Sequence, residues 1–138
     1  MKKTILLFFI AAAMLPLFNA CVPEESTGEN EAGWLTYEVR DGLSFNDAWM
    51  IVVDACLTRG YQFETISKDD GYLKTEYYHE RLDAKGIELK TRISVKFTYG
   101  RKTVRVKIDE EYLMGVKVPG FDVQRVADLK AELRDRLL

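Results

Sequence analysis

The sequence has few of the residues that carry metal and disulfide chemistry. Its 138 residues contain two cysteines, Cys21 and Cys56, and one histidine, His79. Transition-metal sites are built mainly from several Cys and His ligands, so neither a metal site nor a cofactor is predicted. A disulfide is not predicted either, because Cys21 lies in an N-terminal export-like segment and Cys56 on the apolar side of a candidate helix.

A nucleophile motif such as Gly-x-Ser-x-Gly is also missing from the sequence. A catalytic histidine needs a nucleophile or an orienting acid within hydrogen-bond reach, and His79 is interpreted instead as an exposed residue at a strand end. Burial on a helix raises the pKa of a thiol and makes it unreactive, so Cys56 is interpreted as a core residue. We therefore expect no enzymatic activity, and a hydrolase is the weakest functional hypothesis.

Two acidic groups, Asp69-Asp70 and Asp109-Glu110-Glu111, invite a calcium or glycosidase interpretation. Calcium loops need oxygen ligands at alternating positions and a terminal Glu. The segment Lys68-Asp69-Asp70-Gly71 is not followed by this pattern, and Asp70-Gly71 is explained as a turn. A glycosidase needs two carboxylates at a controlled separation in a cleft. Asp109 and Glu111 would share a strand face with Lys107, which can neutralise them.

The charge balance excludes another class of function. Residues 33–138 carry eighteen basic and eighteen acidic side chains. Nucleic-acid binding needs a clustered excess of positive charge, so no nucleic-acid partner is predicted. With 47% hydrophobic and 30% charged residues, the chain is expected to form an ordinary globular fold.

The N-terminus has the three parts of an export signal. Lys2 and Lys3 precede an apolar run over residues 5–17, which is short for a membrane span, and small Ala20 precedes Cys21. Phe18-Asn19-Ala20-Cys21 resembles a bacterial lipobox, with Phe and Asn where Leu and Ala are commonest. The resemblance implies a signal peptide over residues 1–20, lipid attachment at Cys21 and a membrane partner. The implied location is the bacterial cell envelope, at the outer membrane.

Residues 21–33 are predicted to be a lipid-anchored flexible tether, because they are rich in Glu, Pro and Gly and poor in large apolar residues. The acidic stretch after Cys21 also resembles the surface-export signals of some Bacteroidetes lipoproteins. A plain acidic spacer has the same composition, so both the periplasmic and the surface side remain open. The folded domain is expected to span residues 34–138.

Local patterns predict the elements of this domain. Ser44 and Asp47 form a capping-box-like start to a helix that Gly60 would end. Strands are predicted near residues 61–67 and 72–80, joined by Asp70-Gly71, and strict alternation predicts a long strand over 87–99 with a partner over 104–109. Asp122 would cap a final helix. The expected fold is a two-layer α+β domain, in which helix, four antiparallel strands and helix follow in order and both helices pack on one face.

One segment resembles a known family. The relevant residues are Ala48-Trp49, Val52, Ala55-Cys56-Leu57, Gly60-Tyr61, Asp70-Gly71, Leu73 and Thr75. Over residues 45–80 they are similar to the domains of the BamC family of outer-membrane assembly lipoproteins, which have two such domains where this chain has one. The resemblance implies a helix-grip-like fold and a role in an envelope assembly complex without catalysis.

Two groups of residues are candidates for a partner surface. The first consists of the cations that alternate along the long strands: Lys90, Arg92, Lys96, Arg105 and Lys107. They form either a docking patch or a solvated sheet face, where Lys also discourages aggregation. The second is the apolar part of the segment 112–119, with Leu113, Met114, Val116 and Val118. It either packs under the last helix or forms an exposed contact surface.

The sequence therefore favours a non-enzymatic envelope lipoprotein that acts as a small protein-interaction or assembly-accessory module. The alternative is a binder of a small apolar ligand, held between the helices and the sheet. A cavity of several hundred Å³ would favour that alternative.

Overall fold

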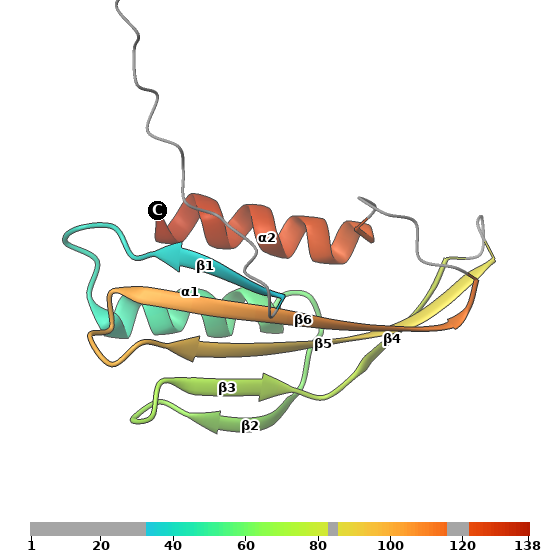
Figure 1. Cartoon of the computed structure of the whole chain (residues 1–138), viewed down its shortest axis with the longest axis horizontal. Helices are drawn as coiled ribbons and strands as arrows, with labels where there is room; N and C mark the ends of the chain where they lie inside the picture. The colour runs from blue at the N-terminus through green and yellow to red at the C-terminus, as the bar shows by residue number, and fades with distance from the viewer. Residues whose placement is uncertain (1–32, 83–85, 116–121) are drawn as a thin grey trace, which may run out of the picture.

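The computed structural model describes residues 33–82, 86–115 and 122–138 (Figure 1). Its elements in chain order are β1 (Trp34–Glu38), α1 (Phe45–Leu57), β2 (Phe63–Ser67), β3 (Tyr72–Thr75), β4 (Tyr78–Leu82), β5 (Ile87–Phe97), β6 (Thr103–Met114) and α2 (Gln124–Leu137). Cys21, Val116 and Val118 lie outside the described residues, as do the predicted signal peptide and nearly all of the tether.

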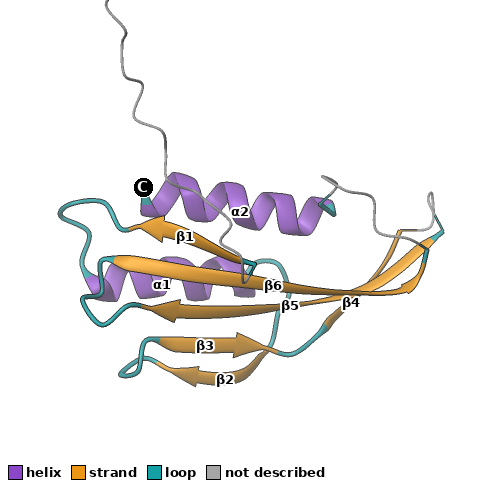
Figure 2. Ribbon diagram, viewed as in Figure 1, coloured by secondary structure: helices purple, strands orange, loops and turns teal. Residues whose placement is uncertain are grey.

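The six strands form one antiparallel sheet in the order β1-β6-β5-β3-β2, and β4 pairs with β5 beyond the end of β3. Both helices pack on one face of this sheet (Figure 2). The predicted α+β class and two-layer arrangement are confirmed. The predicted number of four strands is wrong.

Local signals account for the two ends of α1. The Ser44 hydroxyl accepts a hydrogen bond from the Asp47 amide at 3.1 Å and donates one to the Asp47 carboxylate at 2.6 Å. Gly60 has a φ of 79°, a left-handed conformation that favours glycine, and the Tyr61 amide donates to the Cys56 carbonyl. Both helix boundaries therefore follow from the residues that predicted them.

The alternation along β5 and β6 produces two different sheet faces. Leu89, Ile93, Val95, Val104 and Val106 are fully buried on the face toward the helices. Four of them, all but Leu89, form the main core with apolar residues of both helices, which include Val52, Ala55, Leu129, Leu133 and Leu137. Leu89 belongs to a smaller second cluster with Ile87, Val123 and Val126. The residues that alternate with this buried row, such as Lys90 and Arg92 on β5 and Arg105 and Lys107 on β6, form the opposite, polar face. We call it the outer face.

Two strands account for the wrong strand count. β1 precedes α1 and pairs with β6, with Tyr37 opposite Val104. The predicted strand over 72–80 is divided into β3 and β4, which pair with successive parts of β5. From Lys74 to Tyr78 the chain advances four residues, while their partners Ser94 and Thr91 are three apart. The extra residue is a bulge-like irregularity that interrupts the strand.

Two boundaries near the C-terminus also differ from the prediction. β6 extends to Met114, so the expected loop from Tyr112 begins as strand, because Tyr112 and Met114 still pair with β5. Asp122 does not cap α2: the cap residue is Val123, which makes no side-chain cap hydrogen bond. The Asp122 carboxylate instead forms an ion pair with Lys130 at 2.7 Å.

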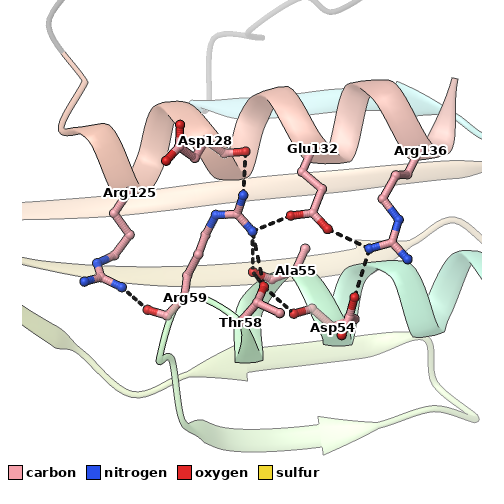
Figure 3. A network of polar contacts seen from close by, with 8 residues as sticks. All are labelled: Asp54, Ala55, Thr58, Arg59, Arg125, Asp128, Glu132 and Arg136. Atoms are coloured by element: carbon pink, nitrogen blue, oxygen red, sulfur yellow. Dashed lines mark hydrogen bonds and ion pairs between the residues drawn. The ribbon is translucent and has the colours of Figure 1, made fainter.

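A network of charged residues joins the two helices (Figure 3). Arg59, just after α1, donates to the Ala55 carbonyl at 3.0 Å, to the Asp128 carbonyl at 2.8 Å and to the Glu132 carboxylate. Glu132 also accepts from Arg136, which in turn donates to Asp54 at 2.9 Å. The network gives a partner to the Ala55 carbonyl, one of the last carbonyls of α1, and fixes α2 beside that helix.

The pKa of Glu132 reflects this network. Burial acts to raise the pKa of its carboxyl, but the hydrogen bonds from Arg59 and Arg136 outweigh burial and lower it below the ordinary value. A lowered folded-state pKa gives stability that is present above the unfolded-state value and is lost as the pH falls through the folded-state value. The network should therefore weaken in acid.

We predict that Glu132→Gln lowers the free energy of unfolding at pH 7 by about 1 kcal/mol, as for partly exposed ion pairs of good geometry. Urea denaturation of both proteins between pH 7 and pH 3 measures the difference. It should stay constant down to about pH 5 and shrink below about pH 4.5, the ordinary range of a glutamate. A difference that does not change across this range would contradict the assigned role of the carboxylate.

Candidate functional site

The structure places all five predicted cations on the outer face. Lys90, Arg92 and Lys96 alternate along β5, and Arg105 and Lys107 alternate along β6. Directly opposite across the two strands lie Lys90 and Glu111, Arg92 and Asp109, Ser94 and Lys107, and Lys96 and Arg105. The cations therefore form one continuous group, but they have different partners.

One half of this group is neutralised by acidic residues. Lys90 forms an ion pair with Glu111 at 2.8 Å, and Asp109 forms ion pairs with both Arg92 and Lys107 at 3.2 Å. The ring of Tyr77 lies under this half, with the Arg92 guanidinium 4.4 Å and the Lys90 ammonium 4.8 Å from its centroid. This part of the face is internally satisfied.

The other half contains two cations that are not held in ion pairs with described residues. Lys96 and Arg105 lie directly opposite each other, and neither forms an ion pair with any residue in the described ranges. The Arg105 guanidinium lies over the indole ring of Trp34, 5.3 Å from its centroid. Glu38 lies on the same face, opposite Thr103. We call Lys96, Arg105 and Trp34 the cationic corner.

The cationic corner opposes the stability of the sheet. Like charges that face each other directly across two strands are destabilising, whereas opposite charges contribute roughly 0.2–1 kcal/mol. Arg105 gains some stabilisation from the indole ring, but Lys96 gains none from an acidic partner. An anionic group bound from outside would relieve the repulsion between the two cations.

The apolar candidates lie elsewhere. Leu113 and Met114 are exposed at the end of β6, by 46% and 59%. Of the two alternatives for this segment, packing under the last helix is therefore wrong for these two residues, which are exposed. Met114 lies nine positions after Arg105 along β6, or about 30 Å at the strand rise, so the two candidate surfaces are distinct.

The structure separates the residues considered for catalysis. Cys56 is 1% exposed, and burial raises the pKa of its thiol to about 12, as expected for an unreactive core cysteine. His79 is exposed on β4 and forms no hydrogen bond with Glu76 or Glu80. It borders a shallow hollow of about 250 Å³ that is also lined by Gln62 and Tyr77.

The acidic groups are divided as well. Asp109 and Glu111 lie on the outer face, as predicted, whereas Glu110 lies opposite Thr91 on the inner face. Lys107 does neutralise Asp109, at 3.2 Å. Asp70 accepts a hydrogen bond from Ser67 at 2.6 Å within the β2–β3 turn. Within the described part of the chain, no three His, Cys, Asp or Glu side chains are grouped as a metal ion would need.

Sequence reasoning missed the aromatic members of the outer face. Trp34 and Tyr77 contact cations that come from β5 and β6, far away in the sequence. One local signal could have placed Trp34 on the outer face. Trp34 and Thr36 alternate with Leu35 and Tyr37, and the latter two face the core. The contact itself depends on the pairing of β1 with β6, which local patterns do not specify.

A further hollow of about 170 Å³ lies between β1 and α2 and is lined by Leu35, Tyr37, Lys130 and Arg134. This volume is below the usual range for small-molecule pockets. None of the helices in the described ranges is long and apolar enough to cross a membrane. The sequence matches no protein-family model, and a comparison with curated proteins gives no match.

Proposed function

We propose that this protein is a non-enzymatic lipoprotein of the bacterial cell envelope that acts as a protein-interaction or assembly-accessory module. It is anchored in the outer membrane by lipid at Cys21. The export-like N-terminus and the acidic tether support the anchoring, and the resemblance of residues 45–80 to the BamC family supports the assembly role. The outer face of the sheet is the docking surface.

The cationic corner is the observation that carries the proposal. Lys96 and Arg105 oppose each other without an acidic partner, although the neighbouring cations of the same face are each paired. A solvated sheet face gains nothing from such a pair, which reduces stability. A docking face gains electrostatic complementarity to an acidic protein segment, which speeds association and excludes wrong partners.

We predict that Lys96→Glu has opposite effects on stability and on binding. The Glu would face Arg105, so the free energy of unfolding should rise by up to about 1 kcal/mol. Capture of the partner should fall severalfold, because the surface loses complementary charge. Stability is measured by urea denaturation. Capture is measured in the native envelope, by crosslinking from a photoreactive amino acid placed at Thr36, which lies opposite Arg105.

Arg134→Glu is the matched control, because it causes the same change in net charge at an exposed position on the helix layer. Its crosslinking should equal that of the unaltered protein. Equal capture by the Lys96→Glu variant would show that the cationic corner does not dock a partner. Loss of capture in both variants would show that only the overall charge matters.

The apolar-ligand alternative has no specific observation in its favour. The residues between the helices and the sheet, among them Val52, Ala55, Ile93 and Val95, are fully buried in one core cluster. A cavity of the size that a ligand requires is not among the hollows described above.

A further inference from the structure

A second surface feature lies at the tips of two neighbouring hairpin turns. An open surface hollow of about 310 Å³, at the lower end of the range for ligand pockets, lies between the β2–β3 turn and the β5–β6 turn. Its lining consists of Asp69, Asp70, Lys96, Phe97, Tyr99 and Arg101. Apart from Lys96, these residues do not belong to the outer-face groups described above.

Arg101 joins the two turns. Its guanidinium donates to the Asp69 carbonyl and lies over the Phe45 ring, 4.5 Å from the centroid. Gly71 has a φ of 63°, and a Cβ at this position would collide with the Arg101 guanidinium. The Phe97 amide donates to the Gly71 carbonyl at 2.8 Å. These contacts hold the two turns together, which reduces the ordering cost of binding between them.

The hollow is lined by one acidic and one basic residue that are not held in ion pairs within the described part of the chain. Asp69 and Lys96 both line the hollow, and their side chains form no ion pair with each other or with other residues of the described ranges. Tyr99 is fully exposed, so its ring and hydroxyl are both accessible. An exposed aromatic residue therefore borders a hollow that is also lined by a carboxylate residue and by a lysine.

We propose that this hollow binds the ring of a neutral saccharide. The C–H face of a sugar stacks on an exposed aromatic ring, and each hydroxyl both donates and accepts, which matches the Asp69 carboxylate and the Lys96 ammonium. The lining contains two acidic and two basic side chains, so it is not selective for an anion or a cation. This inference does not depend on the proposed function.

The test uses the full-length protein in lauryldimethylamine oxide, a detergent without a sugar headgroup. Saturation-transfer difference NMR is recorded with cellotetraose, maltotetraose and chitotetraose, and with glycylglycine as a zwitterion of similar donor and acceptor content. We expect transfer to the ring protons of at least one saccharide and none to glycylglycine. Binding of this kind should have a millimolar Kd, because one exposed ring and few polar groups participate.

Tyr99→Ala should weaken this binding at least tenfold, and Asp69→Asn severalfold. Met50→Ala is the control, because Met50 is also a large exposed residue but lies on α1. Because Tyr99 is fully exposed, its replacement should leave the thermal unfolding midpoint unchanged, which separates lost binding from lost folding. The proposal is overturned if no saccharide shows transfer, if only glycylglycine does, or if the Tyr99→Ala variant binds as well as the unaltered protein.

Discussion

Replacement of Leu129 by alanine should lower the free energy of unfolding by about 2–5 kcal/mol, the usual cost of a Leu→Ala change in a core. Leu129 is completely buried and belongs to the cluster that joins α1, α2 and the inner face of the sheet. The cost combines the lost transfer free energy of the side chain with the cavity that remains. A domain of this size has a total stability of about 5–15 kcal/mol, so a large part of it would be lost.

Urea denaturation followed by circular dichroism measures this effect. Met50→Ala is the matched control, since Met50 is 57% exposed on α1 and its replacement should change stability by less than about 0.5 kcal/mol. If the Leu129 and Met50 variants were equally stable, α2 would not cover the sheet as described.

Replacement of Cys21 by alanine should abolish incorporation of an alkyne-tagged palmitate analogue supplied to the cells. The lipobox resemblance assigns acylation to this residue, and an Ala side chain has no thiol to receive the lipid. Stable anchoring requires more than one acyl chain, because a single chain binds membranes only weakly. Because the lipobox resemblance places the lipid at Cys21 alone, the expected change is complete loss of label from the protein.

Cys56→Ala is the control for this experiment, because it removes the other cysteine of the chain. Cys56 is buried in α1, so its replacement should leave the label in place. Label that persists in the Cys21→Ala variant, or disappears in the Cys56→Ala variant, would assign the lipid to a different residue.

The elements with strong local signals were predicted correctly from the sequence. α1 begins at its Ser44 cap and is followed by left-handed Gly60, and β5 follows the strict alternation from Ile87. These features depend on interactions between residues close in the chain. The features that depend on distant pairing were missed: β1 is defined by its contact with β6, and the break between β3 and β4 by two registers on β5.

The candidate site follows the same division. Alternation was sufficient to place Lys90, Arg92 and Lys96 on one face. Which cations are neutralised depends on the β5–β6 register, which sets Lys96 against Arg105. The hollow beside Tyr99 depends on two turns that meet only in the folded chain, so no local pattern could have predicted it.

The mass of the native protein, purified from bacterial membranes, is the most direct test of a lipid-anchored interaction module. We predict a mature chain that begins at Cys21 and carries the added mass of acyl groups on that residue. An unmodified chain that still begins at Met1 would contradict the lipid anchor and the envelope function that depends on it.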